Sequence, residues 1–428
     1  MSAPRVVIAH YDMPSDVGGV STWIQALVPD LRRRGLDVRV HISNGHDRPG
    51  PNIRHFEANG VPVRSGKAPQ TMLGCVRQCV EWLNLDRPDI YIPNSVLPAY
   101  YAGGYARQFG LQTVGVLHAD DAYFAAIIEE FVAKDSEARF SAVVPVSDYL
   151  QHRVESFAIP NLPCVRIPCG VPVPEKCTSF DPRRFKIVYL GRLVETQKQV
   201  SKVTRALCEA AGRHPSLEAI IIGEGPARAS VEQIIREHPH GDRVRLTGRL
   251  NNQEVYGLLQ SVQAFVLLSD YEGLPVSLLE AMATGVVPIC LKMRSGIQEV
   301  IQQGANGFIV EDRDESFQAV VSRLMADPAI WQACSAGARA TVERDFSSES
   351  CHQKWFGLLT RMADSRLVVR YPLPLPTKMS APHPAFGWNE PDALERLLPF
   401  ATPLRDRIGR WRRTLMKRIA SAGNPSGR

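Results

Sequence analysis

Short apolar runs alternate with longer helical stretches along most of the chain. In the first half, helical stretches separate apolar runs of strand length at 5–11, 36–41, 89–94, 112–118 and 142–147. The same rhythm returns at 185–191, 217–223, 243–248, 262–269, 286–290 and 307–310. Strands that alternate with helices in this way form mostly parallel sheets. The pattern therefore predicts an α/β protein whose two halves each contain a mostly parallel sheet.

Interruptions of the rhythm mark the predicted domain boundaries. Residues 168–184 are rich in proline and charge and lack periodicity, and 371–403 contain eight prolines. We expect, in order, a first domain, a linker, a second domain, one last helix and a Pro-rich basic tail, over residues 1–170, 171–184, 185–345, 346–366 and 367–428.

Length, charge and cysteine usage narrow the class of protein. A chain of 428 residues is too long for one ordinary core, which agrees with two domains. The net charge is +6, but residues 361–428 alone carry 13 basic and 5 acidic groups, so the remaining body is near neutral. A near-neutral body argues against nucleic acid as the main partner.

The nine cysteines are odd in number and scattered, and no CxxC pair occurs. This usage predicts reduced thiols in a cytoplasmic protein, without a disulfide framework or zinc site. No apolar run approaches 18 residues, so we expect no membrane span.

The stretch SDYEGLPVSLLEAMATG (269–285) places two glutamates around an apolar segment. We expect Glu272 in a loop after a buried strand, and a helix from about Val276 that ends near Gly285. Glu280 then lies about a turn and a half inside a helix that is apolar nearly all round. A buried carboxylate needs hydrogen-bond donors. Two hydroxyls of a sugar diol could supply them, and a buried Arg or a backbone amide is the alternative.

Three further strand ends carry glycine and charge. They are GRLVETQK (191–198) with Arg192 and Lys198, GEGP (223–226) with Gly223, and TGRL (247–250) with Arg249 and Leu250. The carboxyl ends of parallel strands share one edge of a sheet, where ligands bind. A guanidinium and an ammonium at that edge suit a pyrophosphate.

These segments resemble the donor-binding half of glycosyltransferase family 4, a retaining family with the GT-B fold. Its pattern G-R-L…K-G, G-x-G-P, S-x-x-E-G-x-P-x-x-x-x-E-A-M-A-x-G and G-G-x-x-E-x-I…N-G is matched by the segments above and by SGIQEVIQQGANGFIV (295–310). The resemblance covers roughly 5–362 and is firm over 185–310. It implies two Rossmann-like domains that face each other across a cleft, with the acceptor in the first (1–170) and the nucleotide sugar in the second (185–345). It also implies a C-terminal helix (346–366) that crosses back to the first domain.

The resemblance also implies the site. Arg192 and Lys198 would hold the diphosphate of a nucleotide-sugar donor, with the start of the helix after Glu272 adding its dipole. Glu280 would hold the ribose hydroxyls. The other donor contacts that it implies are Glu272, Gly273 and Leu274 at the sugar and Arg249 and Leu250 near the base. Two departures from the pattern are Gln199 and Ser295, each in place of a glycine.

In the first domain, Gly18 and Gly19 resemble the glycine loop of the family, which would approach the donor phosphates or the acceptor. A tight turn is the structural alternative. His118 matches a family histidine near the reacting sugar, and the alternative is a loop histidine with satisfied nitrogens. Asp120 or Asp121 would orient it or cap the next helix. Ser147 is expected to be structural.

The implied reaction retains configuration and needs no cofactor and no metal, with the nucleotide-diphosphate sugar as substrate. The charge of the leaving diphosphate would be stabilised by Arg192, Lys198 and the helix dipole. Asp312 and Asp314, in a D-x-D pattern, are expected to be surface residues. Two alternatives stay open: a GT-B-type nucleotide-sugar epimerase and a non-catalytic sugar-nucleotide binder.

The segment LRDRIGRWRRTLMKRI (404–419) has apolar residues on one helical face and basic residues around them. This pattern is typical of a helix that binds an anionic membrane surface, which would favour a lipid-linked over a free glycan acceptor and a peripheral position on the inner face of the membrane. The alternatives are a helix docked on a domain and a disordered tail.

Overall fold

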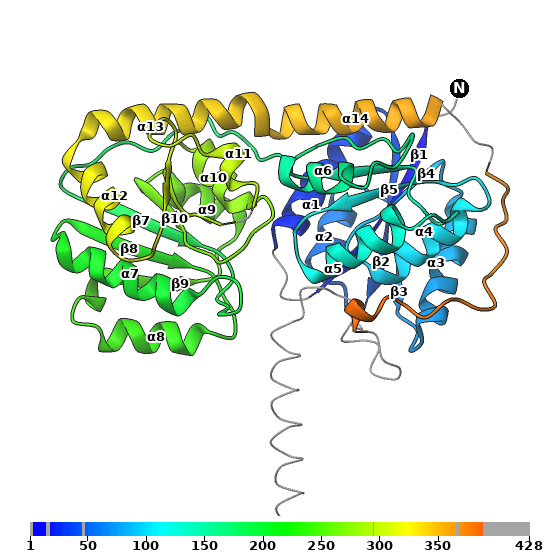
Figure 1. The fold of residues 1–428 in the computed structure, drawn as a ribbon, viewed down its shortest axis with the longest axis horizontal. Coiled ribbons are helices and arrows are strands. Elements are labelled where there is room, and N and C mark those ends of the chain that lie inside the picture. The colour runs from blue at the N-terminus through cyan, green and yellow to red at the C-terminus, as the bar shows by residue number, and fades with distance from the viewer. Residues whose placement is uncertain (1–2, 14–17, 45–47, 294, 365–368, 388–428) are drawn as a thin grey trace, which may run out of the picture.

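The computed structural model describes residues 3–13, 18–44, 48–293, 295–364 and 369–387. Two parallel six-stranded sheets lie side by side, each flanked by the helices that connect its strands (Figure 1). The predicted α/β class with two Rossmann-like sheets is confirmed. The predicted segment 404–419 lies outside the described residues.

The first sheet has the order β3-β2-β1-β4-β5-β6. Its strands are β1 (Arg5–Asp12), β2 (Asp37–Asn44), β3 (Val63–Lys67), β4 (Ile90–Pro93), β5 (Gln112–Leu117) and β6 (Ala142–Pro145). The helices that connect them are α1 (Gly19–Arg33), α2 (Pro51–Ala58), α3 (Met72–Asp86), α4 (Leu97–Arg107), α5 (Ala122–Ile128) and a π-helix η1 (Glu129–Ala133), and α6 (Asp148–Glu155) follows β6. Strand β3 was not predicted, because an edge strand with the sequence VRSGK is only partly buried and lacks an apolar run.

The second sheet has the order β12-β11-β10-β7-β8-β9. Its strands are β7 (Phe185–Leu190), β8 (Leu217–Ile222), β9 (Val244–Gly248), β10 (Ala264–Leu267), β11 (Val287–Leu291) and β12 (Phe308–Val310). The helical segments are α7 (Val200–Arg213), α8 (Arg228–Glu237), η2 (Gly241–Arg243), α9 (Asn252–Leu259), α10 (Val276–Ala283), α11 (Ile297–Val300), α12 (Glu315–Ala326) and α13 (Pro328–Thr341). All strand pairs are parallel, so the loops that follow the strands meet at one edge.

After α13, the π-helix η3 (Val342–Phe346) leads into α14 (Ser348–Asp364), which runs along the first domain (Figure 1). Glu349 pairs with Arg34 at 2.7 Å, and the rings of Trp355 and Trp23 lie 5.8 Å apart. Further along, the Gln112 amide donates to the carbonyl of Met362. The last helix therefore packs on the first domain, which the chain left after α6. None of the described helices is both long and apolar enough to cross a bilayer.

Beyond α14, residues 369–387 pass along the outside of the first domain and end in a short 3-10 turn, η4 (Pro384–Phe386) (Figure 1). We call this segment the strap. Apart from η4 it has no helix or strand, as its prolines predict.

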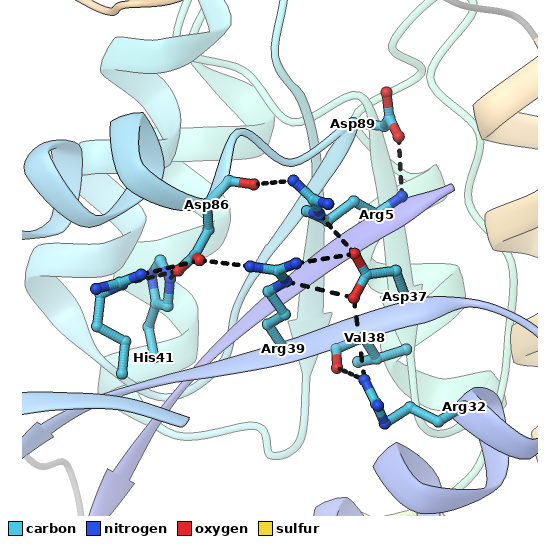
Figure 2. A network of polar contacts seen from close by, with 9 residues as sticks. Arg5, Arg32, Asp37, Val38, Arg39, His41, Asp86 and Asp89 are labelled. Atoms are coloured by element: carbon cyan, nitrogen blue, oxygen red, sulfur yellow. Dashed lines mark hydrogen bonds and ion pairs between the residues drawn. The ribbon is translucent and has the colours of Figure 1, made fainter. Parts of the chain in front are cut away.

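A network of charges around the buried carboxylate of Asp86 joins the start of the first sheet to the end of α3 (Figure 2). The Asp86 carboxylate accepts hydrogen bonds from His41 at 2.8 Å, from Arg64 at 2.8 Å and from Arg39 at 2.9 Å. Arg39 also donates to Asp37. Burial by itself raises the pKa of the Asp86 carboxyl, but the hydrogen bonds from these three groups outweigh it and hold that pKa well below its usual range.

We expect Asp86→Asn to lower the free energy of unfolding by about 1.5–3 kcal/mol, because the half-buried guanidiniums of Arg39 and Arg64 lose hydrogen bonds to a buried charged group. Since the folded-state pKa of Asp86 lies below its unfolded value of 3.8, this stabilisation is present above that value and is lost as the pH falls below it. Urea unfolding at neutral pH measures the change. The control is Glu218→Gln, which removes an exposed partner of Arg184 and should cost less than about 1 kcal/mol. Equal losses in the two variants would contradict the role of the network.

Candidate functional site

Three glycine turns at the carboxyl ends of β7, β8 and β9 are hydrogen-bonded to one another. The amide of Leu193 donates to the carbonyl of Glu224 at 2.9 Å, and that of Gly223 to Gly248 at 2.9 Å. Gly223 has φ +148°, and a Cβ there would stand 1.9 Å from the carbonyl oxygen of Gly191. The predicted convergence of these turns at one edge is confirmed.

A buried ion pair lies at this edge. The ammonium Nζ of Lys198 is 2.5 Å from Oε1 of Glu272, and both residues are less than one-tenth exposed. Gln197 donates from Nε2 to the other oxygen of Glu272 at 3.2 Å and accepts from Nη2 of Arg192 at 3.4 Å. The structure therefore brings together Arg192, Lys198 and Glu272, which the sequence singled out. Gln197, which the sequence did not single out, links Arg192 to Glu272.

Gln199 stands at the departure from the family glycine and has a left-handed backbone, with φ +49°. Glycine adopts this conformation without strain, whereas other residues need compensation. Here the Gln199 side chain donates to Asp270 at 2.7 Å, which ties the start of α7 to the loop that carries Glu272. The loop thus keeps a glycine-like backbone at a non-glycine position.

Helix α10 begins directly after the ion pair, with Pro275 at its N-cap. Its first amides have no partners within the helix, so this end favours an anion. Glu280 is the fifth residue of α10 and is buried, as predicted. Among the described residues, no group forms a hydrogen bond or an ion pair with its carboxylate, and burial raises the pKa of Glu280 to about 7.

The two domains meet where these loops end. A Cβ on Gly273 would stand 2.0 Å from the carbonyl oxygen of His118, and one on Gly19 would stand 2.9 Å from the Val276 side chain. The second contact brings the start of α1 against the start of α10. Glycine is therefore needed at both positions for the observed approach. Gly18, the N-cap of α1, has an ordinary extended backbone with φ −67°.

A third contact between the domains involves Glu299 of α11, which the sequence analysis did not select. Its carboxylate accepts the amide of Asp148, the first residue of α6, at 2.8 Å, and Arg166 lies 3.8 Å away. Burial raises the pKa of Glu299, against the lowering effect of the Asp148 amide. Glu299 follows Ser295 and Gly296 in the family-like segment, and that position was the available signal.

The His118 ring lies inside the first domain. Its Nε2 donates to Oδ1 of Asn94 at 2.7 Å, its Nδ1 is 4.0 Å from the sulfur of Cys169, and burial lowers the pKa of His118 to about 3. The imidazole is therefore neutral, with both nitrogens facing protein groups. Its carbonyl, and not its ring, meets Gly273. A contact between the His118 ring and the sugar stays a prediction.

The carboxylates of Asp120 and Asp121, which follow His118 in sequence, bind different groups. Asp121 caps α5 by accepting the amide of Phe124 at 2.9 Å, and Asp120 accepts the hydroxyl of Tyr149 at 2.8 Å. Neither carboxylate is bonded to the His118 ring, which Asn94 holds instead. Ser147 caps α6, as its expected structural role requires.

The remaining predicted residues lie at or near the same edge of the second sheet. Arg249 is exposed and Leu250 half-buried in the turn between β9 and α9. Leu274 is buried beside Gly273. Ser295 accepts the amide of Ile297, so its hydroxyl supports the start of α11.

The first aspartate of the D-x-D pattern stabilises the turn that leads into α12. Asp312 accepts the amides of Asp314 and Ser316 ahead of α12, on the exposed surface that the sequence predicted.

Models of known protein families match both halves of the chain. Residues 17–174 match a model described as Glycosyltransferase Family 4, and residues 176–341 match one described as Glycosyl transferases group 1. Together the two matches cover well over half of the chain.

Curated relatives carry related descriptions. The lipopolysaccharide core biosynthesis glycosyltransferase LpsD of Rhizobium meliloti is 25% identical over 80% of this chain and 95% of its own length. The putative colanic acid biosynthesis glycosyltransferase WcaL of Escherichia coli is 26% identical over 64% of this chain and 70% of its own.

Solved structures share the fold. Anabaena Alr3699/HepE in complex with UDP superposes with a TM-score of 0.66 at 18% identity, over 84% of this chain and 100% of that one. Sucrose-phosphate synthase from Thermosynechococcus elongatus gives 0.67 at 16% identity, over 85% and 100%. The likeness shows the GT-B arrangement.

We expect Glu280→Gln to stabilise the ligand-free protein at pH 8 by on the order of 3 kcal/mol and much less at pH 5. The folded-state pKa of Glu280, about 7, exceeds its ordinary value of 4.5, so its ionisation in the folded state becomes a growing penalty as the pH rises between these values. Urea unfolding at both pH values measures the effect. Glu232→Gln, at an exposed carboxylate on α8, is the control. A pH-independent gain at position 280 would contradict the unpartnered carboxylate.

We expect Gly273→Ala to lower the free energy of unfolding by about 1–3 kcal/mol, because the added methyl would overlap the His118 carbonyl. Gly257→Ala is the matched control, since nothing lies within 4 Å of a Cβ there. In the middle of α9 it should stabilise by about 0.5–1 kcal/mol. Urea unfolding of both variants compares them, and a harmless Gly273→Ala would mean that the two domains do not approach at this point.

Proposed function

The chain belongs to glycosyltransferase family 4, and from that premise we propose which groups it transfers and how. It moves a hexose-type sugar from a nucleotide-diphosphate donor to a hydroxyl of a glycan or lipid-linked acceptor, with retained configuration and without a resident metal. The observation that carries the proposal is the joined cluster of Arg192, Gln197, Lys198 and Glu272 at the start of α10. It combines anion-binding groups with a sugar-binding carboxylate at one edge of the sheet.

The diphosphate would lie between the two cations and the first turn of α10. The Lys198 ammonium has three N–H donors, so it can keep its bond to Glu272 and still donate to a phosphate oxygen. The amides at the start of α10 add donors that no helical carbonyl uses. Charge that develops on the leaving diphosphate would therefore meet donors that are already in place.

The ribose would satisfy Glu280. A vicinal diol presents two hydroxyl donors, and the carboxylate has no partner among the described residues. Ligand hydrogen bonds favour the ionised form, so donor binding should strengthen as the pH rises through about 7. The alternative that a buried Arg or a backbone amide pairs with Glu280 has no support in the contacts of the described residues.

In the proposed step, the acceptor oxygen bonds to the anomeric carbon on the face from which the diphosphate leaves. The bond between that carbon and the phosphate oxygen breaks, and the acceptor proton passes to the departing diphosphate. Glu272, with the backbone at Gly273 and Leu274, would orient the donor sugar. Arg249 and Leu250 would lie near the base.

The biological setting is proposed from the relatives, whose descriptions name lipopolysaccharide core and colanic acid biosynthesis. We infer assembly of a surface polysaccharide or glycolipid. Contact with an anionic membrane surface through 404–419, at the inner face of the membrane, is a proposal from sequence alone.

The proposal is tested by incubating the full chain with UDP- and GDP-sugars, with and without glycan or lipid-linked acceptors. We expect acceptor-dependent release of nucleoside diphosphate that EDTA leaves unchanged. NMR of the product should show the anomeric configuration of the donor. Interconversion of donor sugars without acceptor would indicate the epimerase alternative, and donor binding without turnover would indicate a binding protein.

We expect Lys198→Ala to lower kcat by about 10²–10³-fold, because it removes a cation that stabilises the leaving group. Glu280→Ala should instead raise the donor KM with a smaller effect on kcat, because it removes ribose binding. The matched control is Arg313→Met. It removes a cation that pairs with Asp270, a residue of the loop that carries Glu272. Steady-state kinetics on folded variants separate the three. Equal losses at Lys198 and Arg313 would contradict the assigned roles.

A further inference from the structure

The strap (369–387) holds the outside of the first domain at two places. The proximal anchor lies beside α3, where Leu373 exchanges two hydrogen bonds with the side chain of Asn84, at 2.6 and 2.9 Å. Next to it, the hydroxyl of Tyr371 donates to the carbonyl of Pro88. Leu373 itself is only 2% exposed, so this end of the strap is fixed to the domain by both polar and apolar contacts.

The distal anchor lies on α5 and η1. His383 accepts the amide of Ala385 at Nδ1, which leaves Nε2 as the donor to Glu129, 3.0 Å away. The amide of His383 also donates to the hydroxyl of Tyr101 at 3.2 Å. Phe386 is 6% exposed and packs edge-on against Tyr123 with ring centroids 5.4 Å apart.

Tyr123 belongs to an aromatic cluster beneath the strap. Its ring lies 6.4 Å from that of Tyr100, which in turn lies 5.9 Å from Phe131 of η1. Phe386 thus adds one more ring to a cluster that links α4, α5 and η1. Edge-to-face aromatic pairs contribute about 0.5–1.5 kcal/mol beyond the burial of apolar area, so this anchor holds the helix.

Helix α5, like α1 and α6, begins at the junction of the two domains. Its cap Asp121 is three residues beyond His118, whose carbonyl meets Gly273 of the second domain. It continues into the π-helix η1, a wide turn that is frequent at functional sites. A change in the position of α5 therefore reaches the junction of the two domains within one loop.

We propose that the strap is an acceptor-side positioning element, in which Phe386 and His383 hold α5 and η1 so that the loop 118–121 receives the acceptor in register with the donor. The inference rests on the proposed transfer reaction, in which the donor lies at the edge of the second sheet and the acceptor reaches it from the first domain, whose loop 118–121 meets Gly273. Neither side chain touches the site, so both are positioning residues. The strap follows the last residue that the family models match.

The test uses the full chain with Phe386→Ala, and with Leu373→Ala as the matched control at the proximal anchor. We expect Phe386→Ala to raise the acceptor KM about tenfold while the donor KM and acceptor-free hydrolysis stay within about twofold. Leu373→Ala, with a similar loss of buried apolar surface, should leave all three unchanged. His383→Gln keeps a hydrogen-bond donor for Glu129, so it should raise the acceptor KM less than His383→Ala does.

Hydrogen exchange supplies a readout that needs no activity. Phe386→Ala should speed exchange in 122–133 and leave 148–155 in α6 unchanged. Unaltered exchange in 122–133, or equal changes in donor and acceptor KM, would overturn the inference even if transfer is observed. If the wild-type chain transfers no sugar but Phe386→Ala still speeds exchange in 122–133, the proposed transfer reaction is contradicted, whereas the contact by which the strap holds α5 is supported.

Discussion

The arrangement of the site depends on how closely the carboxyl ends of two parallel sheets can approach. At Gly273 the backbone of one domain lies against the His118 carbonyl of the other, and at Gly19 the start of α1 lies against Val276. A side chain at either glycine would overlap its neighbour, so the contact exists only because no Cβ is present. This approach places the loops of the first domain beside the ion pair of the second.

Two buried carboxylates, one in each domain, differ in how many partners balance their charge. At the start of the first sheet, the Asp86 carboxylate is surrounded by His41, Arg64 and Arg39, so burial of its charge is fully compensated (Figure 2). At the carboxyl edge of the second sheet, Glu280 is buried without such compensation among the described residues. Buried groups with perturbed pKa values concentrate at functional sites, and the contrast separates a structural network from a candidate ligand contact. In the proposed function, the hydroxyls of a ribose diol would donate to this carboxylate and offset the cost of burying its charge.

Parts of the chain outside the sheets also bear on the site. The last helix crosses from the second domain to the first, and the strap continues to the start of α5 (Figure 1). Glu299 adds a contact in the other direction, because its carboxylate caps α6. The junction is therefore supported from several sides by segments distant in sequence.

The sequence by itself determined the elements and the chemistry of their ends. Alternating apolar runs and helical stretches predicted two parallel sheets, because buried strands and helices differ in length and period. The buried strand before Glu272 and the helix signals from Val276 to Gly285 predicted one carboxylate in a loop and one inside a helix, as observed.

Only the tertiary structure decided which groups meet. Gln197 as a bridge, Asn94 as the partner of His118 and the cap made by Glu299 depend on distances between separate loops, which local patterns do not encode. The edge strand β3 was missed for a related reason, since half-buried residues need no apolar period. Local sequence specifies what each segment can become, whereas the packing of the two domains selects its partners.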